Sequence, residues 1–352
     1  MSESHHPVDH VRDAWYIAAT SKHVERGPIA CEILDTPLVL FQGEGGKIAA
    51  LLDRCAHRNV PLSVGRVRGD EIECGYHGWR YGADGICRHV PTMCGPVEGR
   101  ARRVESYPVR EQQGYVWVYM NPEEPSPDHE PYRFPYLDEA TYSSTAYSYD
   151  FSASVHATLE NILDVPHTAF LHGGLFRNSK EANEITVLIQ RYTDRVEAQF
   201  VGEPRPGGIL GWLLAPRGGT TEHWDRFLLP SVAEVEYKLG RSHLLISSAL
   251  TPLGDFKTRM YAVASLRFPV IGRLISRFLR PFAMMVVRQD AKMLTHQSEA
   301  IRRFGGERFA STAVDVLGAH ILRLLRRSAR GESRPSTTAE PVGDPERMIM
   351  RV

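Results

Sequence analysis

Cysteine is scarce in this chain, with five residues in 352, which excludes the disulfide framework of small secreted domains. No sign of charge prevails either. The 42 basic and 42 acidic residues give a formal net charge of zero, so no nucleic-acid partner is indicated. Residues 1–12 hold neither an apolar segment nor a twin arginine. We therefore expect a flexible arm there, no export signal and a cytoplasmic protein.

A nucleotide-binding fingerprint is also missing. The chain has no Gly-x-Gly-x2-Gly sequence and no second, four-cysteine cluster motif. Redox chemistry driven by NAD(P)H would therefore need another polypeptide to deliver the electrons. The length of 352 residues predicts about two domains.

Two short pairs of metal-binding residues stand out, Cys55-x-His57 and Cys74-x2-His77. Two thiolates and two imidazoles can hold a Rieske [2Fe–2S] cluster, with cysteine on one iron and histidine on the other. Zinc binds the same residue types, but a zinc finger usually places cysteine with cysteine and histidine with histidine. The spacing therefore favours the iron cluster, and it leaves Cys31, Cys87 and Cys94 without a role.

Around these pairs, residues 15–119 resemble the N-terminal domain of the Rieske non-haem iron oxygenases. The matching phrases are Ala14-Trp15-Tyr16, the run from Cys55 to Pro61-Leu62-Ser63, and the run from Cys74 to Trp79. The motif is specific for the cluster and less specific for the reaction that the cluster supplies.

A second segment, residues 160–172, contains His167 and His172. Five positions separate them, which on a regular helix places them about 140° out of phase. They can bind one metal only where the helix is irregular, and Pro166 gives a reason, because it removes a backbone N–H and disturbs the preceding turn. An Fe(II) that activates O2 typically takes two histidines and one carboxylate on one face.

This segment resembles the catalytic signature of the same oxygenases, Asn-x2-Asp-x2-His-x4-His. The resemblance implies Asp290, which follows a glutamine, as the third iron ligand. Glu299 is the alternative ligand. A solvated Asp290 that pairs with Arg288 or Lys292 on a helix face also stays open.

The resemblance implies roles for Asp164 and Asn161 as well. In the family, the aspartate three residues before the first iron histidine bridges to the second Rieske histidine of a neighbouring subunit. Asp164 would therefore contact His77 of the next protomer in a homotrimer, where a carboxylate between two imidazoles orders both. Asn161 would lie near the iron without being an obligatory ligand. An Asp164 that only orients His167, or lies on a helix surface, is the alternative.

The pattern of apolar segments predicts an α+β chain. Strands separated by tight turns indicate an all-β Rieske domain over 13–120, followed by a proline-rich linker over 121–135 and a catalytic domain over 136–330. Successive strands without intervening helices predict an antiparallel sheet, with strands at 147–151, 185–189, 196–201, 233–237, 244–250 and 260–268. Helices are predicted at about 154–172 and 282–304, and residues 331–352 are predicted to be disordered. This arrangement resembles the family's helix-grip domain, whose sheet wraps around a cavity.

The resemblance implies a terminal oxygenase. Electrons from a separate NAD(P)H-dependent reductase, directly or through a ferredoxin, would pass through the cluster to a mononuclear Fe(II) that activates O2. The Asn-x2-Asp spacing is closer to the demethylating and steroid-hydroxylating members than to the naphthalene-type dioxygenases, so arene cis-dihydroxylation is the alternative. A Rieske electron carrier without chemistry of its own and a lipid-binding helix-grip module are the readings from other classes.

Apolar residues around the presumed cavity predict a large, weakly polar substrate, sterol-like or aromatic. They are Ile209, Leu210, Trp212, Leu213, Phe227, Leu228, Leu229 and residues 282–287. Arg205, Arg217 and Arg226 could instead converge on a carboxylate. Residues 203–219 are read either as a gate or as a loop packed on the core. Residues 269–287 are too charged to span a bilayer. We expect a buried helix there, with contact to a membrane surface as the alternative, and residues 321–330 raise the same question.

Overall fold

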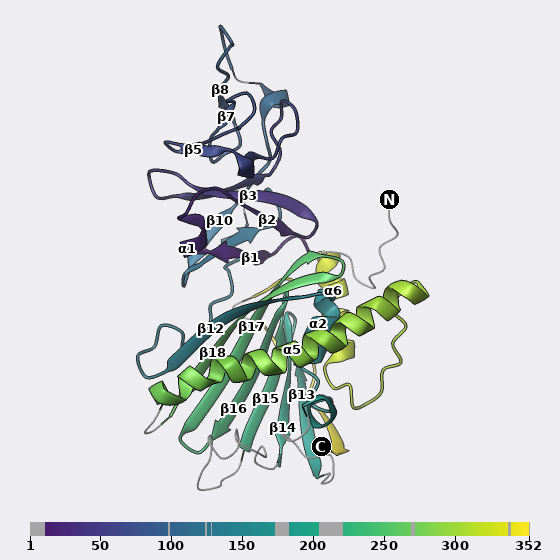
Figure 1. Cartoon of the computed structure of the whole chain (residues 1–352). Coiled ribbons are helices and arrows are strands. Elements are labelled where there is room, and N and C mark those ends of the chain that lie inside the picture. The colour runs from purple at the N-terminus through teal and green to yellow at the C-terminus, as the bar shows by residue number, and fades with distance from the viewer. Residues whose placement is uncertain are drawn as a thin grey trace. The chain divides into compact units, whose positions relative to one another are not determined.

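The computed structural model describes residues 11–97, 99–123, 125–127, 129–172, 183–203, 221–268, 272–336 and 339–351, without the side chains of 272–279. The predictions about residues 204–219 and about the first ten residues fall outside this part of the chain. The chain divides into two compact units, Arg12–Arg133 and Phe134–Val352 (Figure 1).

The described residues of the first unit form three small antiparallel sheets. One contains β1 (Trp15–Thr20), β11 (Tyr115–Tyr119) and β10 (Val109–Gln112). The second contains β2 (Ile29–Ile33), β3 (Thr36–Gln42), β4 (Ile48–Leu52) and β9 (Ser106–Tyr107). The third contains β5 (Arg66–Arg68), β6 (Glu71–Glu73), β7 (Arg80–Tyr81) and β8 (Cys87–His89). The short helices of this unit are α1 (Ser21–Val24), η1 (Leu62–Val64) and η2 (Arg100–Arg102).

Part of the segment predicted as a linker packs onto this unit. The Trp15 indole N–H donates to the carbonyl of His129 at 2.8 Å, and the Tyr119 hydroxyl lies 3.1 Å from His129 Nδ1. These bonds join the segment to β1 and β11, so the compact unit extends to Arg133.

The second unit contains one eight-stranded sheet in the order β12-β18-β17-β16-β15-β14-β13-β19, and every pair is antiparallel. The α+β architecture and the antiparallel sheet predicted from the sequence are confirmed. The strands are β12 (Ser143–Phe151), β13 (Glu184–Arg191), β14 (Arg195–Val201), β15 (Thr221–Leu228), β16 (Val232–Leu239), β17 (Ser242–Gly254), β18 (Lys257–Arg267) and β19 (Glu346–Arg351).

The long helix α5 (Gly272–Phe304) lies across this sheet (Figure 1). Its buried residues recur at spacings of four and three, which is the period of a helix with one face on a core. They are Val287, Ala291, Leu294, Ser298 and Ile301. The helices α2 (Val155–Ile162), α3 (Thr168–Leu171) and α6 (Gly318–Ala329) belong to the same unit.

Two sequence predictions need correction. The helix expected over 154–172 is broken into α2 and α3, because Pro166 disfavours helical geometry at the residue before it. The tail is not disordered throughout: residues 346–351 form β19, which pairs with β13.

Residues 321–330, for which we weighed a buried helix against contact with a membrane surface, lie mostly within the helix α6. Its residues Ile321, Leu324 and Leu325 are buried, and the helix contacts α2 and β14. Its apolar face is therefore part of the core. Among the described residues, no helix is long and apolar enough to cross a membrane.

Candidate iron sites

The four predicted cluster ligands lie on two loops of the same design. In the first, the Cys55 N–H donates to Val60 and the Asn59 N–H donates to Cys55. In the second, the Cys74 N–H donates to Trp79 and the Gly78 N–H donates to Cys74. The fifth residue of each loop is left-handed, with φ of +61° at Asn59 and +69° at Gly78. Asparagine and glycine are the residues that adopt this conformation most readily.

The two loops bring like ligands together. Cys55 and Cys74 are both 2 % exposed, and the thiol of Cys74 is within hydrogen-bonding reach of Cys55. The ring centroids of His57 and His77 are 4.5 Å apart. Nδ1 of His57 is buried and has no hydrogen-bond partner among the described residues. A pair of thiols, a pair of imidazoles and an orphaned ring nitrogen fit the ligand set of a Rieske cluster.

Two aromatic residues hold this arrangement in place. The His57 ring stacks on Trp79, with centroids 4.7 Å apart and planes 1° apart. The Tyr81 hydroxyl lies 3.2 Å from Cys55 Sγ. Burial, followed by the neighbouring Cys55, raises the pKa of Tyr81, so its O–H stays protonated and can donate to the sulfur.

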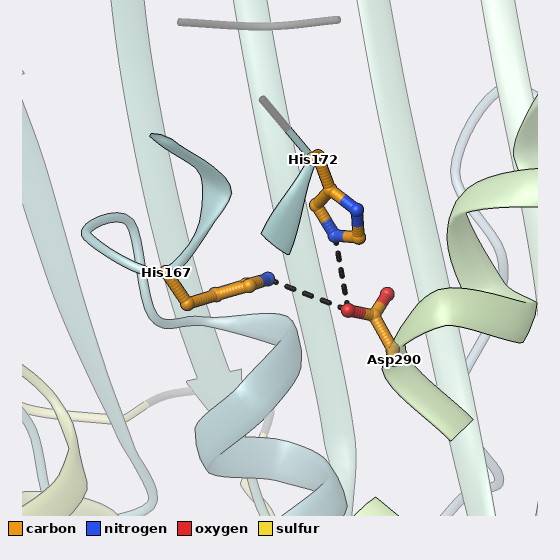
Figure 2. Close-up of side chains that lie close together, drawn as sticks. All are labelled: His167, His172 and Asp290. Carbon is orange, nitrogen blue, oxygen red and sulfur yellow. Dashed lines mark ion pairs between the residues drawn. The ribbon is translucent and has the colours of Figure 1, made fainter. Parts of the chain in front are cut away.

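The second unit brings His167, His172 and Asp290 to one point (Figure 2). One ligand atom from each lies within 4.8 Å of the other two. Asp290 Oδ1 is 3.5 Å from His167 Nε2 and 3.0 Å from His172 Nε2. This oxygen is buried and accepts no well-aligned hydrogen bond from the described residues. Two imidazoles and an orphaned carboxylate oxygen on one point fit the ligand set of a non-haem Fe(II).

Hydrogen bonds on the far side of each ring fix how the histidines face this point. His172 Nδ1 lies 2.7 Å from Gln289 Oε1. His167 Nδ1 bonds to the carbonyl of Asp164 and lies 3.5 Å from that residue's carboxylate. When Nδ1 carries the hydrogen, the Nε2 lone pair of each ring is free to bind a metal.

The electrostatics of the three groups favour a positive charge between them. Burial opposes protonation of His167, but the carboxylates of Asp164 and Asp290 outweigh it and raise the pKa of His167 to about 9. Burial also opposes ionisation of Asp290, but the two imidazoles hold the pKa of Asp290 below its usual value. A metal cation at this point satisfies the same preference, and its binding would displace the proton.

The local sequence explains why histidines five apart can meet. Ser154 caps α2 by accepting a hydrogen bond from the Ala157 N–H at 3.1 Å, and the helix ends at Ile162. Residues 163–167 form turns, so His167 lies at the start of α3 and His172 directly after it. Asp290 lies on the buried side of α5, next to Ala291.

The other predicted residues are placed as follows. Asn161 lines the cavity beside the three ligands, and Asp164 lies at its edge with 36 % of its side chain exposed. Glu299, the alternative ligand, is 65 % exposed and pairs with His296. Arg226 pairs with Glu234 and Glu236 and is not among the cavity residues.

The predicted lining of the cavity was partly wrong. Residues 227–229 do not reach the cavity. Val286 and Val287 on α5, from the predicted stretch 282–287, do line it. The other apolar walls come from β16, β17 and β18, through Val235, Leu244, Ile246 and Met260. Sequence reasoning also missed a buried polar cluster on this wall, formed by Glu203, His223 and Asp225. The sequence signals this cluster only weakly, because His223 and Asp225 are just two polar residues at alternate positions and Glu203 is distant from them in the chain.

Comparison with known proteins identifies the class. Residues 14–108 match the Rieske [2Fe-2S] domain, and residues 151–331 match the vanillate O-demethylase oxygenase C-terminal domain. The chain belongs to this family of Rieske-type oxygenases, which are oxidoreductases that incorporate oxygen from O2. Its cofactors are accordingly a Rieske cluster and a mononuclear iron, with electrons supplied by a reductase.

Two relatives align over nearly their whole length. The vanillate O-demethylase oxygenase subunit of Pseudomonas sp. strain HR199 is 25% identical, over 93% of this chain and 97% of its own. The chloroacetanilide N-alkylformylase oxygenase component of Rhizorhabdus wittichii DC-6 is 25% identical, over 95% and 99%. Both are oxygenase parts of larger systems.

Solved structures show the same fold. Dicamba monooxygenase bound to 3,6-dichlorosalicylic acid superposes with a TM-score of 0.77 at 23% identity, covering 92% of this chain and 98% of that one. NdmA of Pseudomonas putida CBB5 with caffeine superposes with a TM-score of 0.78 at 20% identity, covering 94% and 96%.

Proposed function

We propose that this chain is the terminal oxygenase of a multi-component system and that it hydroxylates or oxidatively demethylates a hydrophobic ring compound. The observation that carries the proposal is the convergence of His167, His172 and Asp290 within 4.8 Å on the wall of a cavity. An iron held there would activate O2 when electrons reach it from the cluster. Relatives named vanillate O-demethylase, dicamba O-demethylase and chloroacetanilide N-alkylformylase support this class of reaction.

Different residues of the chain bind the cluster, enclose the substrate and contact it. Cys55 and Cys74 would hold one iron of the cluster, and His57 and His77 would hold the other. The apolar walls of the cavity, from Val235 to Val287, bury the rings of the substrate and exclude water beside the reacting bond. Asn161 lines the same cavity as the three candidate ligands and would contact the substrate there.

Asp164 is the proposed entry point for electrons. Its carboxylate reaches His167, while a third of its side chain stays exposed. On its outer side lies a hollow of about 580 Å³ between α2, α5 and α6, lined in part by Glu160 and His296. His77 is exposed on its loop beside Tyr76, which is 63 % exposed. In a head-to-tail homotrimer, His77 of one protomer would meet Asp164 of the next.

The partner that supplies electrons is an NAD(P)H-dependent reductase, directly or through a ferredoxin. The names of the relatives as oxygenase subunits and components support this division of labour.

The proposal is tested with the iron-loaded protein, a surrogate reductase and a panel of sterols, polycyclic arenes and aryl methyl ethers. A substrate should stimulate O2 uptake and yield hydroxylated product, or formaldehyde from a methyl ether, in proportion to the O2 consumed. The matched His167→Ala protein should show neither. Failure of every ring compound to give coupled product would contradict the proposal.

A further inference from the structure

A buried charged cluster forms part of the wall of the substrate cavity. Glu203, His223 and Asp225 line the same cavity as the three iron ligands, and each is at most 5% exposed. His223 and Asp225 lie on β15, where alternate residues face inward, while Glu222 between the inward positions is exposed. Charged side chains are rarely buried this deeply unless they are paired or used.

In the Glu203–His223–Asp225 cluster, contacts on several sides hold the His223 ring in place. His223 Nδ1 lies 2.6 Å from Glu203 Oε2, and His223 Nε2 lies 3.0 Å from Asp225 Oδ1. The ring is held between Phe200 and Tyr237, with centroid distances of 4.5 and 4.1 Å and planes within 20° of parallel. The imidazole cannot turn away from either carboxylate without losing these stacking contacts.

Both ring nitrogens face carboxylate oxygens, so both carry hydrogens. Burial opposes this charge, but Asp225 and Glu203 outweigh it and raise the pKa of His223 to about 9. An imidazolium between two carboxylates leaves the three groups together with one net negative charge. The carboxylates of Glu203 and Asp225, which both line the cavity, can then only accept hydrogen bonds.

Apart from the iron proposed at His167, His172 and Asp290, the rest of the described lining offers no fixed cation to balance an anionic ligand. It contains no lysine or arginine. Its other basic side chains, His167 and His172, face Asp290. Arg226, next to Asp225 in sequence, is held by Glu234 and Glu236. A ligand carboxylate beside Asp225 would therefore meet the negative charge of Asp225, and the proposed iron would be the one fixed cation in the described part of the cavity.

We infer that Asp225 is a specificity-determining residue: it binds an O–H or N–H group of the substrate, and the Glu203–His223–Asp225 cluster disfavours substrates that carry a carboxylate. This inference rests on the proposed function and narrows its substrate class to neutral or cationic ring compounds with a hydrogen-bond donor. A hydrogen bond to a charged acceptor in such a site changes affinity by about ten- to a hundredfold, and a buried like charge is penalised as well.

Three ligands with the same ring system separate the possibilities. They are a methoxynaphthol, the methoxynaphthalene without the hydroxyl, and the methoxynaphthoate with a carboxylate at the same position. Binding to the iron-loaded protein is measured by calorimetry, and formaldehyde release is measured with the surrogate reductase. We expect the naphthol to bind at least about tenfold more tightly than either of the others.

Two variants assign the preference to Asp225. Asp225→Asn keeps the shape and removes the charge, so most of the advantage of the naphthol over the naphthoate should be lost. Glu222→Gln removes a carboxylate from the exposed face of the same strand and should leave the preference intact. If the Glu203–His223–Asp225 cluster only stabilised the fold, Asp225→Asn would lower the free energy of unfolding. The ratio of the naphthol affinity to the naphthoate affinity would then stay unchanged.

The inference is overturned if the naphthoate binds as well as the naphthol, if the naphthol does not bind, or if Asp225→Asn retains the full preference. The comparison of ligands on the unaltered protein holds even if a variant fails to fold. Demethylation of the naphthoate would contradict the inference and would support the oxygenase proposal. The expected order of binding would support the inference even if none of the three ligands gave product, because the oxygenase proposal is contradicted only when the whole panel of ring compounds fails.

Discussion

At the scale of single residues, the candidate iron histidines depend on the groups behind them. Gln289 accepts from His172 Nδ1 at 2.7 Å and is the direct neighbour of Asp290. Gln289 therefore orients the candidate ligand His172, and the adjacent Asp290 is itself a candidate ligand. Partners of this kind typically contribute about ten- to a hundredfold to metal affinity.

We predict that Gln289→Leu lowers the affinity for the mononuclear iron by about ten- to a hundredfold. The matched Gln289→Glu variant keeps an acceptor at the same place and should retain most of the affinity. Competition with a chelator measures the iron, and the absorbance of the cluster should be the same in both variants. Equal iron affinity in the leucine and glutamate variants would show that this bond does not orient His172.

At the scale of elements, β19 completes one edge of the large sheet. Its register places Met350 opposite Ile185, and both side chains are buried. Its neighbour Ile349 points the other way and is 65 % exposed. The last strand in sequence is therefore held mainly by its inward side chains and its ladder of bonds to β13.

Met350→Ala should lower the free energy of unfolding by about 2–3 kcal/mol, because a buried side chain leaves a cavity. Ile349→Ala, on the exposed face of the same strand, should change it by less than about 0.5 kcal/mol. Urea unfolding followed by circular dichroism measures both, and the cluster absorbance should be unaffected. Equal effects at the two positions would mean that β19 is not seated on β13 in solution.

How far the sequence predicts these elements depends on the range of the interactions. The strands predicted at 185–189 and 196–201 lie within β13 and β14, and the cluster ligands lie on two short loops, so local patterns sufficed. The strand β15 was missed, because His223 and Asp225 occupy inward positions that normally carry apolar side chains. The strand β19 was missed because its partner, β13, is far away in the chain. The broken helix at Pro166 was foreseen as an irregularity but not as two helices.

At the scale of the whole molecule, we propose that electron transfer crosses from one chain to the next. A trimeric ring in which His77 of one protomer serves Asp164 of the next makes a specific prediction for mixed assemblies. His77→Ala chains keep an intact mononuclear site, and His167→Ala chains keep an intact cluster. Each alone should be inactive.

Mixing the two chains in equal amounts, after dissociation and reassembly, should restore about a quarter of the wild-type turnover. In a directed ring, one interface in four then joins an intact cluster to an intact mononuclear site. Sedimentation should show the same trimer for the wild-type, parent and mixed samples. No turnover in the mixture, or full activity of a wild-type monomer, would rule out transfer between protomers.

The central claim is that His167, His172 and Asp290 hold a catalytic iron that is separate from the cluster. Iron quantitation on Asp290→Ala, with Glu299→Ala as the control on the same helix, tests it most directly. The wild-type and Glu299→Ala proteins should contain about three irons per chain. Asp290→Ala should contain about two, retain the cluster spectrum and lose all coupled oxidation of substrate. An Asp290→Ala protein with about three irons and full turnover would contradict the account.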